Sequence, residues 1–273
     1  MLACLRHALG LALAIAAFVA AMPAASPRTD AIAGIAQRGP AARLRARLDR
    51  ATAHVAEGRT ADALDATSAL LADLEARRGS PEELLADDVI LGAAREAAGL
   101  RAEALLAADP PRAGFRADFL RAHAAGATFA DWALGVPASV TLAQAVLESD
   151  WGRSAPGNNL FGLKGEGPAG STVRRVVEYR GGKRRTKMAP FRAYPTVDGS
   201  MVDHGEILAR SRRYARARAV AEDADAYARA LQGVYATDPR YARKLSRLMD
   251  DLGLRRFDWF AHAEPRAGEG AAR

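Results

Sequence analysis

Glu148 ends an apolar stretch of the sequence and is the first candidate for chemistry. The segment LAQAVLESDWG (142–152) leaves almost no polar face before Glu148, so its helix should be buried. The negative end of the helix dipole, the charge of Asp150 and the apolar wall of Trp151 should all raise the pKa of Glu148. A carboxylic acid that stays protonated near neutral pH can serve as a general acid. From these residues alone, a solvated surface position for Glu148 is an equal alternative.

Five sequence blocks, in a fixed order, resemble one family of enzymes. They are SVTLAQAVLESDWG, NNLFGLKG, VVEY, FRAYPTVDGSMVDHGEIL and YATDPRYARKL, and they fall within residues 115–252. Together they resemble the glucosaminidase domains of bacterial cell-wall hydrolases, glycoside hydrolase family 73 (mannosyl-glycoprotein endo-β-N-acetylglucosaminidase-like), which include the C-terminal domain of the flagellar peptidoglycan hydrolase. The resemblance implies a lysozyme-like α+β fold that cleaves the glycan strands of peptidoglycan after N-acetylglucosamine.

The resemblance implies catalytic roles for Glu148, Glu178 and Tyr235. Glu148 matches the catalytic acid, although Asp150 stands where the family usually has glycine, and Glu178 in VVEY matches a second acidic residue on a hairpin. Glycoside hydrolysis usually needs two carboxylates, but their separation, and with it the stereochemical outcome, stays open. Without the resemblance, Glu178 is better explained as a strand glutamate that pairs with an arginine. Tyr235 is alternatively a partly buried core tyrosine.

Three further residues are candidates for substrate binding: Trp151, Asn159 and Phe161. Trp151 suits stacking on a sugar face, or it walls the acid. Asn159 and Phe161 lie in the NNLFGLKG loop, where turn architecture is the main expectation and sugar contact the secondary one. Tyr241 is expected to pack in the core, and Asp238 to cap the last helix with Pro239 at its first position.

His204 in MVDHGEIL lacks the spacing of a zinc motif, so we expect it on a helix surface or in an internal hydrogen bond. No metal and no cofactor is implied by any motif in the chain.

The pattern of apolar residues and breakers predicts the elements that position these side chains. Helices are expected at 115–124, 128–134 and 137–150, followed by a Gly- and Asn-rich loop at 152–172. TVRRVVEY and KRRTKMAPFRAY, joined through Gly181 and Gly182, predict a β-hairpin. Further helices are expected at about 197–211, 222–233 and 239–251. The fold class is therefore α+β, with a small β-hairpin lobe facing an α lobe and an all-α helical module in front.

The chain divides into five expected segments. Residues 1–25 read as a secretory signal peptide, with an uncleaved anchor as the alternative. A helical module at 41–108, a linker at 109–114 around two prolines, the glucosaminidase domain at 115–257 and a disordered tail at 258–273 follow. No membrane-spanning helix is expected after cleavage, and the protein should be periplasmic or secreted.

The net charge and the cysteine content are typical of an exported protein that binds an acidic polymer. The formal net charge is +7, and the single cysteine, Cys4, would leave with the signal peptide, so no disulfide is expected. Six basic residues surround the hairpin: Arg174, Arg175, Lys183, Arg184, Arg185 and Lys187. They form either a solvated face or a surface that attracts the wall polymer. Nucleic acid is not an expected partner outside the cytoplasm.

The favoured hypothesis is an exported peptidoglycan hydrolase, an endo-β-N-acetylglucosaminidase with Glu148 as general acid. A lytic transglycosylase or muramidase is the alternative within the same fold class. A non-catalytic wall-binding or assembly protein, whose N-terminal helices bind a protein partner, is the alternative from another class. The cellular process, with flagellum assembly among the candidates, is not fixed by the sequence.

Overall fold

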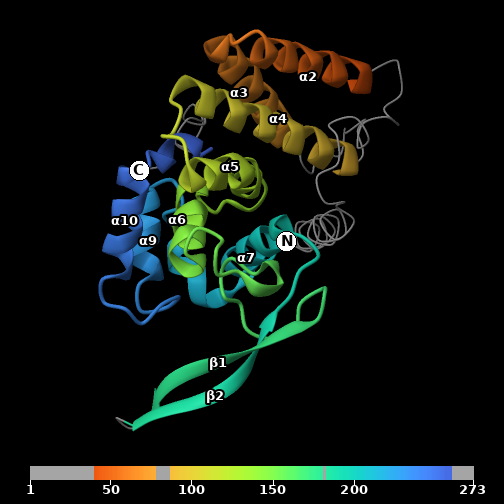
Figure 1. The fold of residues 1–273 in the computed structure, drawn as a ribbon. Helices are drawn as coiled ribbons and strands as arrows, with labels where there is room; N and C mark the ends of the chain where they lie inside the picture. Colours follow the sequence, from red (N-terminus) through yellow and green to blue (C-terminus); the bar gives the residue numbers. More distant parts are fainter. Residues whose placement is uncertain (1–39, 78–86, 181–182, 260–273) are drawn as a thin grey trace, which may run out of the picture.

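The computed structural model describes residues 40–77, 87–180 and 183–259, with the backbone alone at both helix starts (40–41 and 87–88) and at the hairpin tip (176–180 and 183–185). The expected signal peptide at 1–25 lies outside these residues. Figure 1 shows α2, α3 and α4 at one end, α5 to α10 in the middle and a two-stranded hairpin at the other end. None of the helices in the described part of the chain combines the length and hydropathy that a membrane crossing requires.

The N-terminal helices share a hydrophobic core with the rest of the protein. They are α2 (Pro40–Ala56), α3 (Thr60–Arg77) and α4 (Asp87–Ala108). Their buried leucines and alanines form one cluster with Phe129 and Trp132 of α5 (Phe115–Leu134). The indole N–H of Trp132 donates to the backbone oxygen of Leu71 at 3.0 Å. Shared burial of this kind stabilises both parts together, so the helical module packs on the following domain as one body.

Two buried helices form the centre of the fold. The sequence predicted a break between 124 and 128, but α5 continues through this segment. Glycine suits position 126, because a Cβ atom there would lie 3.1 Å from the Sδ atom of Met201. Gly135 then ends α5 in the left-handed conformation, with φ 66°, a common helix C-cap. The next helix, α6 (Ala138–Ser149), is buried over nearly its whole length, as its apolar sequence predicted.

The hairpin is confirmed as two antiparallel strands, β1 (Ser171–Arg180) and β2 (Lys183–Arg192). Backbone bonds fix its base, since Ala193 N donates to Gly170 O and Ala169 N donates to Ala193 O, both at 3.0 Å. Beyond the hairpin, α7 (Val197–Arg210) is capped at its N-terminus by Thr196, whose hydroxyl accepts from the N–H of Gly199. The hairpin therefore leaves the helical body from a fixed base.

Short helices complete the domain. They are α8 (Ala215–Arg218), α9 (Ala224–Leu231) and α10 (Tyr241–Asp251), with 3-10 turns η1 (Pro156–Asn158), η2 (Arg212–Tyr214) and η3 (Leu254–Phe257). Their apolar residues close a core around α6 that includes Tyr227, Leu231, Leu245 and Met249. This mostly helical arrangement with one small antiparallel sheet agrees with the expected fold class.

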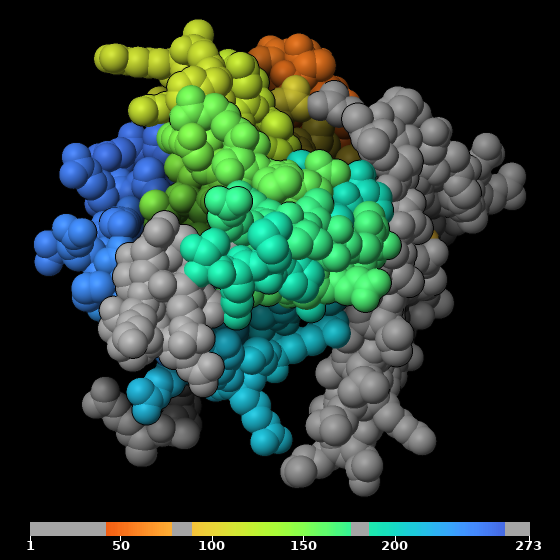
Figure 2. Space-filling view, turned by 60° about the horizontal axis from the view of Figure 1, so that its bottom comes forward, coloured from red at the N-terminus to blue at the C-terminus, as the bar shows by residue number. Residues whose placement is uncertain are grey.

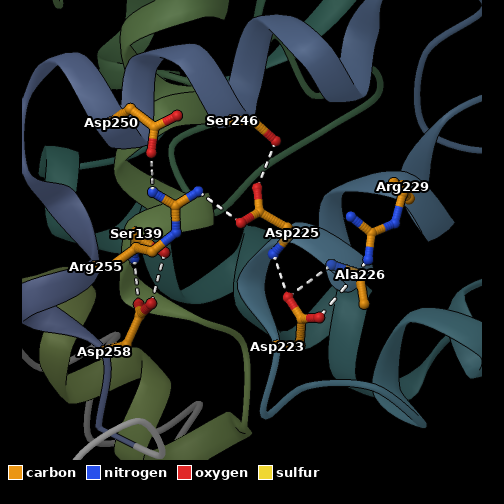
Figure 3. Close-up of polar contacts among 9 residues, drawn as sticks. All are labelled: Ser139, Asp223, Asp225, Ala226, Arg229, Ser246, Asp250, Arg255 and Asp258. Carbon is orange, nitrogen blue, oxygen red and sulfur yellow. Dashed lines mark hydrogen bonds and ion pairs between the residues drawn. The ribbon is translucent and has the colours of Figure 1, made fainter.

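The chain after α10 ties several elements together. Figure 3 shows the guanidinium of Arg255 between Asp225 and Asp250, and Asp258 against Ser139 at the start of α6. Trp259 is only 2% exposed, and its indole N–H donates to Glu75 of α3 at 3.0 Å. The expected start of a disordered tail at residue 258 is therefore wrong, since Asp258 and Trp259 are both buried. Residues 260–273 lie outside the described part.

Candidate active site

Glu148 lies in the last turn of α6 and is exposed at the protein surface, unlike the buried residues that precede it in the helix. Its Oε1 accepts a hydrogen bond of 3.2 Å from the hydroxyl of Tyr241. Burial raises the pKa of Glu148, and this effect outweighs the lowering by the Tyr241 bond and by the charge of Lys244. The direction agrees with the sequence prediction. Repulsion by Asp150 is not among the causes, and Asp150 instead pairs with Arg153 at 2.7 Å.

The chain turns sharply just after Glu148. Asp150 and Trp151 both have positive φ, 51° and 61°, and Asp150 is the left-handed C-cap of α6. Ser149 supports the turn, because its hydroxyl donates to Ala145 O at 2.5 Å and accepts from Gly152 N at 2.7 Å. Left-handed conformations are uncommon for residues other than glycine, so Asp150 adopts a geometry that glycine would adopt more easily.

Two tyrosines line the region beside Glu148. The rings of Tyr235 and Tyr241 stack at 5.8 Å between centroids and an angle of 20°. Burial raises the pKa of Tyr235 well above its usual value, and the negative charge of Glu148 adds to this effect. A neutral phenol keeps its hydrogen for donation. Tyr241, which the sequence assigned to packing alone, is buried as expected and also bonds the candidate acid.

Glu178 is placed only by its backbone. It lies on β1 and pairs in register with Arg185 on β2. In Figure 2 the described part of the hairpin (green and teal) and the C-terminal helices (blue) are visible on the same face of the molecule. The structure therefore brings Glu148, Tyr235 and Tyr241 together, while the position of the Glu178 carboxylate lies outside the described atoms.

The three residues expected to bind substrate have different surroundings. The side chain of Asn159 is bonded within the protein, to Leu163 at 2.9 and 3.0 Å and to Arg192 O at 2.9 Å. Phe161 is buried and stacks on His204 at 3.8 Å. Both arrangements correspond to the architectural alternative. Trp151 is partly exposed and packs edge-on against Phe115 and Phe119, with the Arg116 guanidinium 5.2 Å from its ring.

His204 differs from both sequence expectations. It is fully buried, and neither ring nitrogen bonds a described residue, so it is neither on a helix surface nor in an internal hydrogen bond. Burial lowers its pKa to about 3, which keeps the imidazole neutral between Phe161 and Tyr235. Over residues 40–77, 87–180 and 183–259, no cluster of three or more His, Cys, Asp or Glu could hold a metal ion.

A glutamate at the end of a buried helix, two adjacent tyrosines and a projecting hairpin define a lysozyme-like glycoside hydrolase domain. Comparison with family models agrees, because residues 126–254 match the glucosaminidase family, described as mannosyl-glycoprotein endo-beta-N-acetylglucosaminidase. The chain belongs to the glucosaminidase family through these residues, and the matched range contains Glu148, Glu178 and Tyr235.

Two curated relatives and one solved structure show what this part of the chain is similar to. A probable N-acetylmuramidase of Lactococcus lactis is 42% identical over 134 residues, which are 45% of this chain and 30% of that protein. Peptidoglycan hydrolase FlgJ of Salmonella typhimurium is 38% identical over 156 residues, 53% of this chain and 48% of FlgJ. The catalytic domain of the autolysin Auto from Listeria monocytogenes is 32% identical, with a TM-score of 0.50, and the match covers 56% of this chain and 93% of that domain. This chain thus spans at most about half the length of these two curated relatives.

Proposed function

We propose that the protein is an exported peptidoglycan hydrolase that cuts glycan strands as an endo-β-N-acetylglucosaminidase. The observation that carries the proposal is Glu148, a carboxyl of raised pKa that ends the buried helix α6 inside the family match. In the reaction, protonated Glu148 gives its proton to the glycosidic oxygen of the leaving sugar. No cofactor or metal takes part in this scheme.

Glu178 and Tyr235 complete the proposed catalytic group. A second carboxylate serves as base, as nucleophile or as partner of the substrate's acetamido group, and Glu178 on the hairpin is the candidate. Tyr235, next to Tyr241, has a neutral phenol that can donate to the acetamido group or to developing charge. Of Trp151, Asn159 and Phe161, the partly exposed Trp151 is the candidate for sugar contact, whereas Asn159 and Phe161 are buried and support the loop.

Two different glycosidic bonds of the glycan strand are candidates for cleavage. The family description names a glucosaminidase, whereas the lactococcal relative is named a muramidase. A muramidase or lytic transglycosylase on the same scaffold would use Glu148 in the same way and bind the strand shifted by one sugar. The alternative of another class, a non-catalytic wall-binding or assembly protein, is disfavoured because Glu148, Glu178 and Tyr235 are all present.

The proposed location is the periplasm or the cell exterior, from the signal-like sequence at 1–25 and from relatives named for peptidoglycan. The basic residues of the hairpin would attract the carboxylates of the wall, and this attraction weakens as salt screens it. The helices α2 to α4 are a candidate surface for a protein partner, in flagellum assembly or another wall process.

Digestion of purified peptidoglycan by the mature protein tests the proposal. The soluble fragments are reduced with borohydride and analysed by mass spectrometry, with Glu148→Gln as the control variant. Reduced N-acetylglucosamine ends that disappear in Glu148→Gln are the expected result. Reduced N-acetylmuramic ends would make the protein a muramidase, and anhydro-muramic ends a lytic transglycosylase. Absence of fragments from folded protein on several wall preparations would favour the binding protein.

A further inference from the structure

Tyr241 connects the candidate acid to a buried amide. Its hydroxyl oxygen accepts from Gln144 Nε2 at 2.9 Å, and its hydrogen is donated to Glu148 Oε1 at 3.2 Å. The amide nitrogen can only donate, so the phenol hydrogen is left for the carboxylate. The hydrogen bonds therefore run in one direction, from Gln144 through Tyr241 to Glu148.

Both ends of this connection are fixed in the protein. Gln144 lies one helical turn before Glu148 on α6 and is fully buried. Tyr241 begins α10, is 2% exposed and stacks on Tyr235. Because neither the amide nor the phenol can swing into solvent, the position of Glu148 Oε1 is set by atoms of two helices.

We propose that Tyr241 is a positioning residue that holds Oε1 of Glu148 and so presents Oε2 to the glycosidic oxygen, with Gln144 fixing the direction of the Tyr241 hydroxyl. No hydrogen bond or ion pair joins Oε2 to a described residue, which leaves that oxygen for the substrate. Tyr241 acts through Glu148 and does not itself touch the substrate. The inference deepens the proposed function and rests on it for the role of Glu148.

The same hydrogen bond sets the acid strength of Glu148. A donor to the ionised carboxylate lowers its pKa, against the rise that burial causes, and Lys244 on α10 acts in the same direction as Tyr241. Burial and the charge of Glu148 raise the pKa of Tyr241 itself, and Tyr235 is shifted in the same way. The phenols therefore stay neutral, and Tyr241 is a donor at every pH at which the protein would work.

Tyr241→Phe is the direct test, because it removes the hydroxyl and keeps the stacked ring. The carboxyl of Glu148 is titrated by NMR with 13C-labelled glutamate, and its signal is assigned with Glu148→Gln. We expect the midpoint to rise by about one pH unit, since a hydrogen bond to the charged form is lost. The alkaline limb of the pH–activity profile should move upward with it, and kcat should fall about tenfold with little change in KM.

Tyr227→Phe is the matched control, because Tyr227 is equally buried but its hydroxyl bonds no described residue. It should leave both the Glu148 midpoint and the profile unchanged. Gln144→Leu should shift the midpoint in the same direction as Tyr241→Phe but by less, because a phenol that accepts a bond is a better donor. An unchanged Glu148 midpoint in Tyr241→Phe, or an equal shift in Tyr227→Phe, would overturn the inference. The titration needs no turnover, so it decides this inference even if the digestion of peptidoglycan fails.

Discussion

Asp258 accepts two hydrogen bonds from Ser139, one from its backbone N–H at 2.6 Å and one from its hydroxyl at 2.7 Å. Asp131 holds the neighbouring residue, accepting from the N–H of Ala138 at 3.0 Å and from that of Trp259 at 2.9 Å. Two buried carboxylates thus bind the N-terminus of α6, where the helix dipole favours negative charge. Glu148 lies at the opposite end of the same rigid helix, so the C-terminal segment helps to fix the candidate acid.

Asp258→Asn should change how stability depends on pH. Burial raises the pKa of Asp258 to about 6, although the bonds from Ser139 oppose this effect, and the charge of Asp258 raises the pKa of Asp131 in turn. The folded state then binds a proton more tightly than the unfolded state, so stability is lost as pH rises from about 4 to 6. The asparagine variant lacks this loss and should gain about 2 kcal/mol relative to the natural protein between pH 4 and 7.

Urea unfolding at pH 4, 5, 6 and 7 measures this difference. Ser139→Ala is the companion variant, because it removes a donor to the ionised carboxylate and should enlarge the loss with pH. A constant stability difference between Asp258→Asn and the natural protein across this range would show that Asp258 titrates alike in both states.

The local pattern of the sequence was sufficient for part of this architecture. The apolar run of α6 predicted its burial and the raised pKa of Glu148, and the paired strand patterns around Gly181 and Gly182 predicted the hairpin. The link between Gln144 and Tyr241 was not predictable in this way, because 97 positions separate the two residues. Tyr241 follows a helix-start signal, and no local feature distinguishes a packing tyrosine from one that bonds a carboxylate.

The C-terminal boundary of the domain was predicted wrongly, again because the contacts that decide it join residues far apart in the sequence. Asp258 and Trp259 directly precede a segment of polar, alanine and glycine residues, so composition placed them in a tail. Their partners are Ser139, Asp131 and Glu75, all more than a hundred residues away in the chain. His204 was missed because a lone histidine in a helix usually bonds water or a neighbour, whereas here tertiary packing buries it and neither ring nitrogen bonds a described residue.

Protonation of His204 should make folding stability depend on pH with the opposite sign to the effect of Asp258. Its pKa is about 3 in the folded protein, so protonation favours the unfolded state, and stability is lost as pH falls from about 6.5 toward 3. His204→Phe keeps a flat ring beside Phe161 and removes the proton site. Between pH 7 and pH 4 the variant should lose about 3 kcal/mol less stability than the natural protein.

Chemical unfolding at the two pH values checks the prediction for His204. Any cost of fitting the larger ring is the same at both, so it cancels in the comparison. His123 also has a pKa lowered by burial, and it is present in both proteins, so its effect cancels too. Equal acid sensitivity of the two proteins would mean that the imidazole is not buried in solution.

A substitution at Gly167 should disturb the base of the hairpin and thereby lower activity. A Cβ atom at Gly167 would lie 2.5 Å from the backbone oxygen of Ala193, which belongs to the bonds that hold the base. Backbone atoms cannot move aside as a side chain does, so Gly167→Ala should destabilise the protein by about 1–3 kcal/mol. Because Glu178 is carried by this hairpin, wall hydrolysis should fall more than the loss of folded protein explains.

Gly99→Ala in α4 is the control, since its Cβ would meet nothing within 4 Å, and it should stabilise the protein by about 0.5 kcal/mol. Melting curves and peptidoglycan digestion of both variants decide the point, and full activity of Gly167→Ala at normal stability would contradict it.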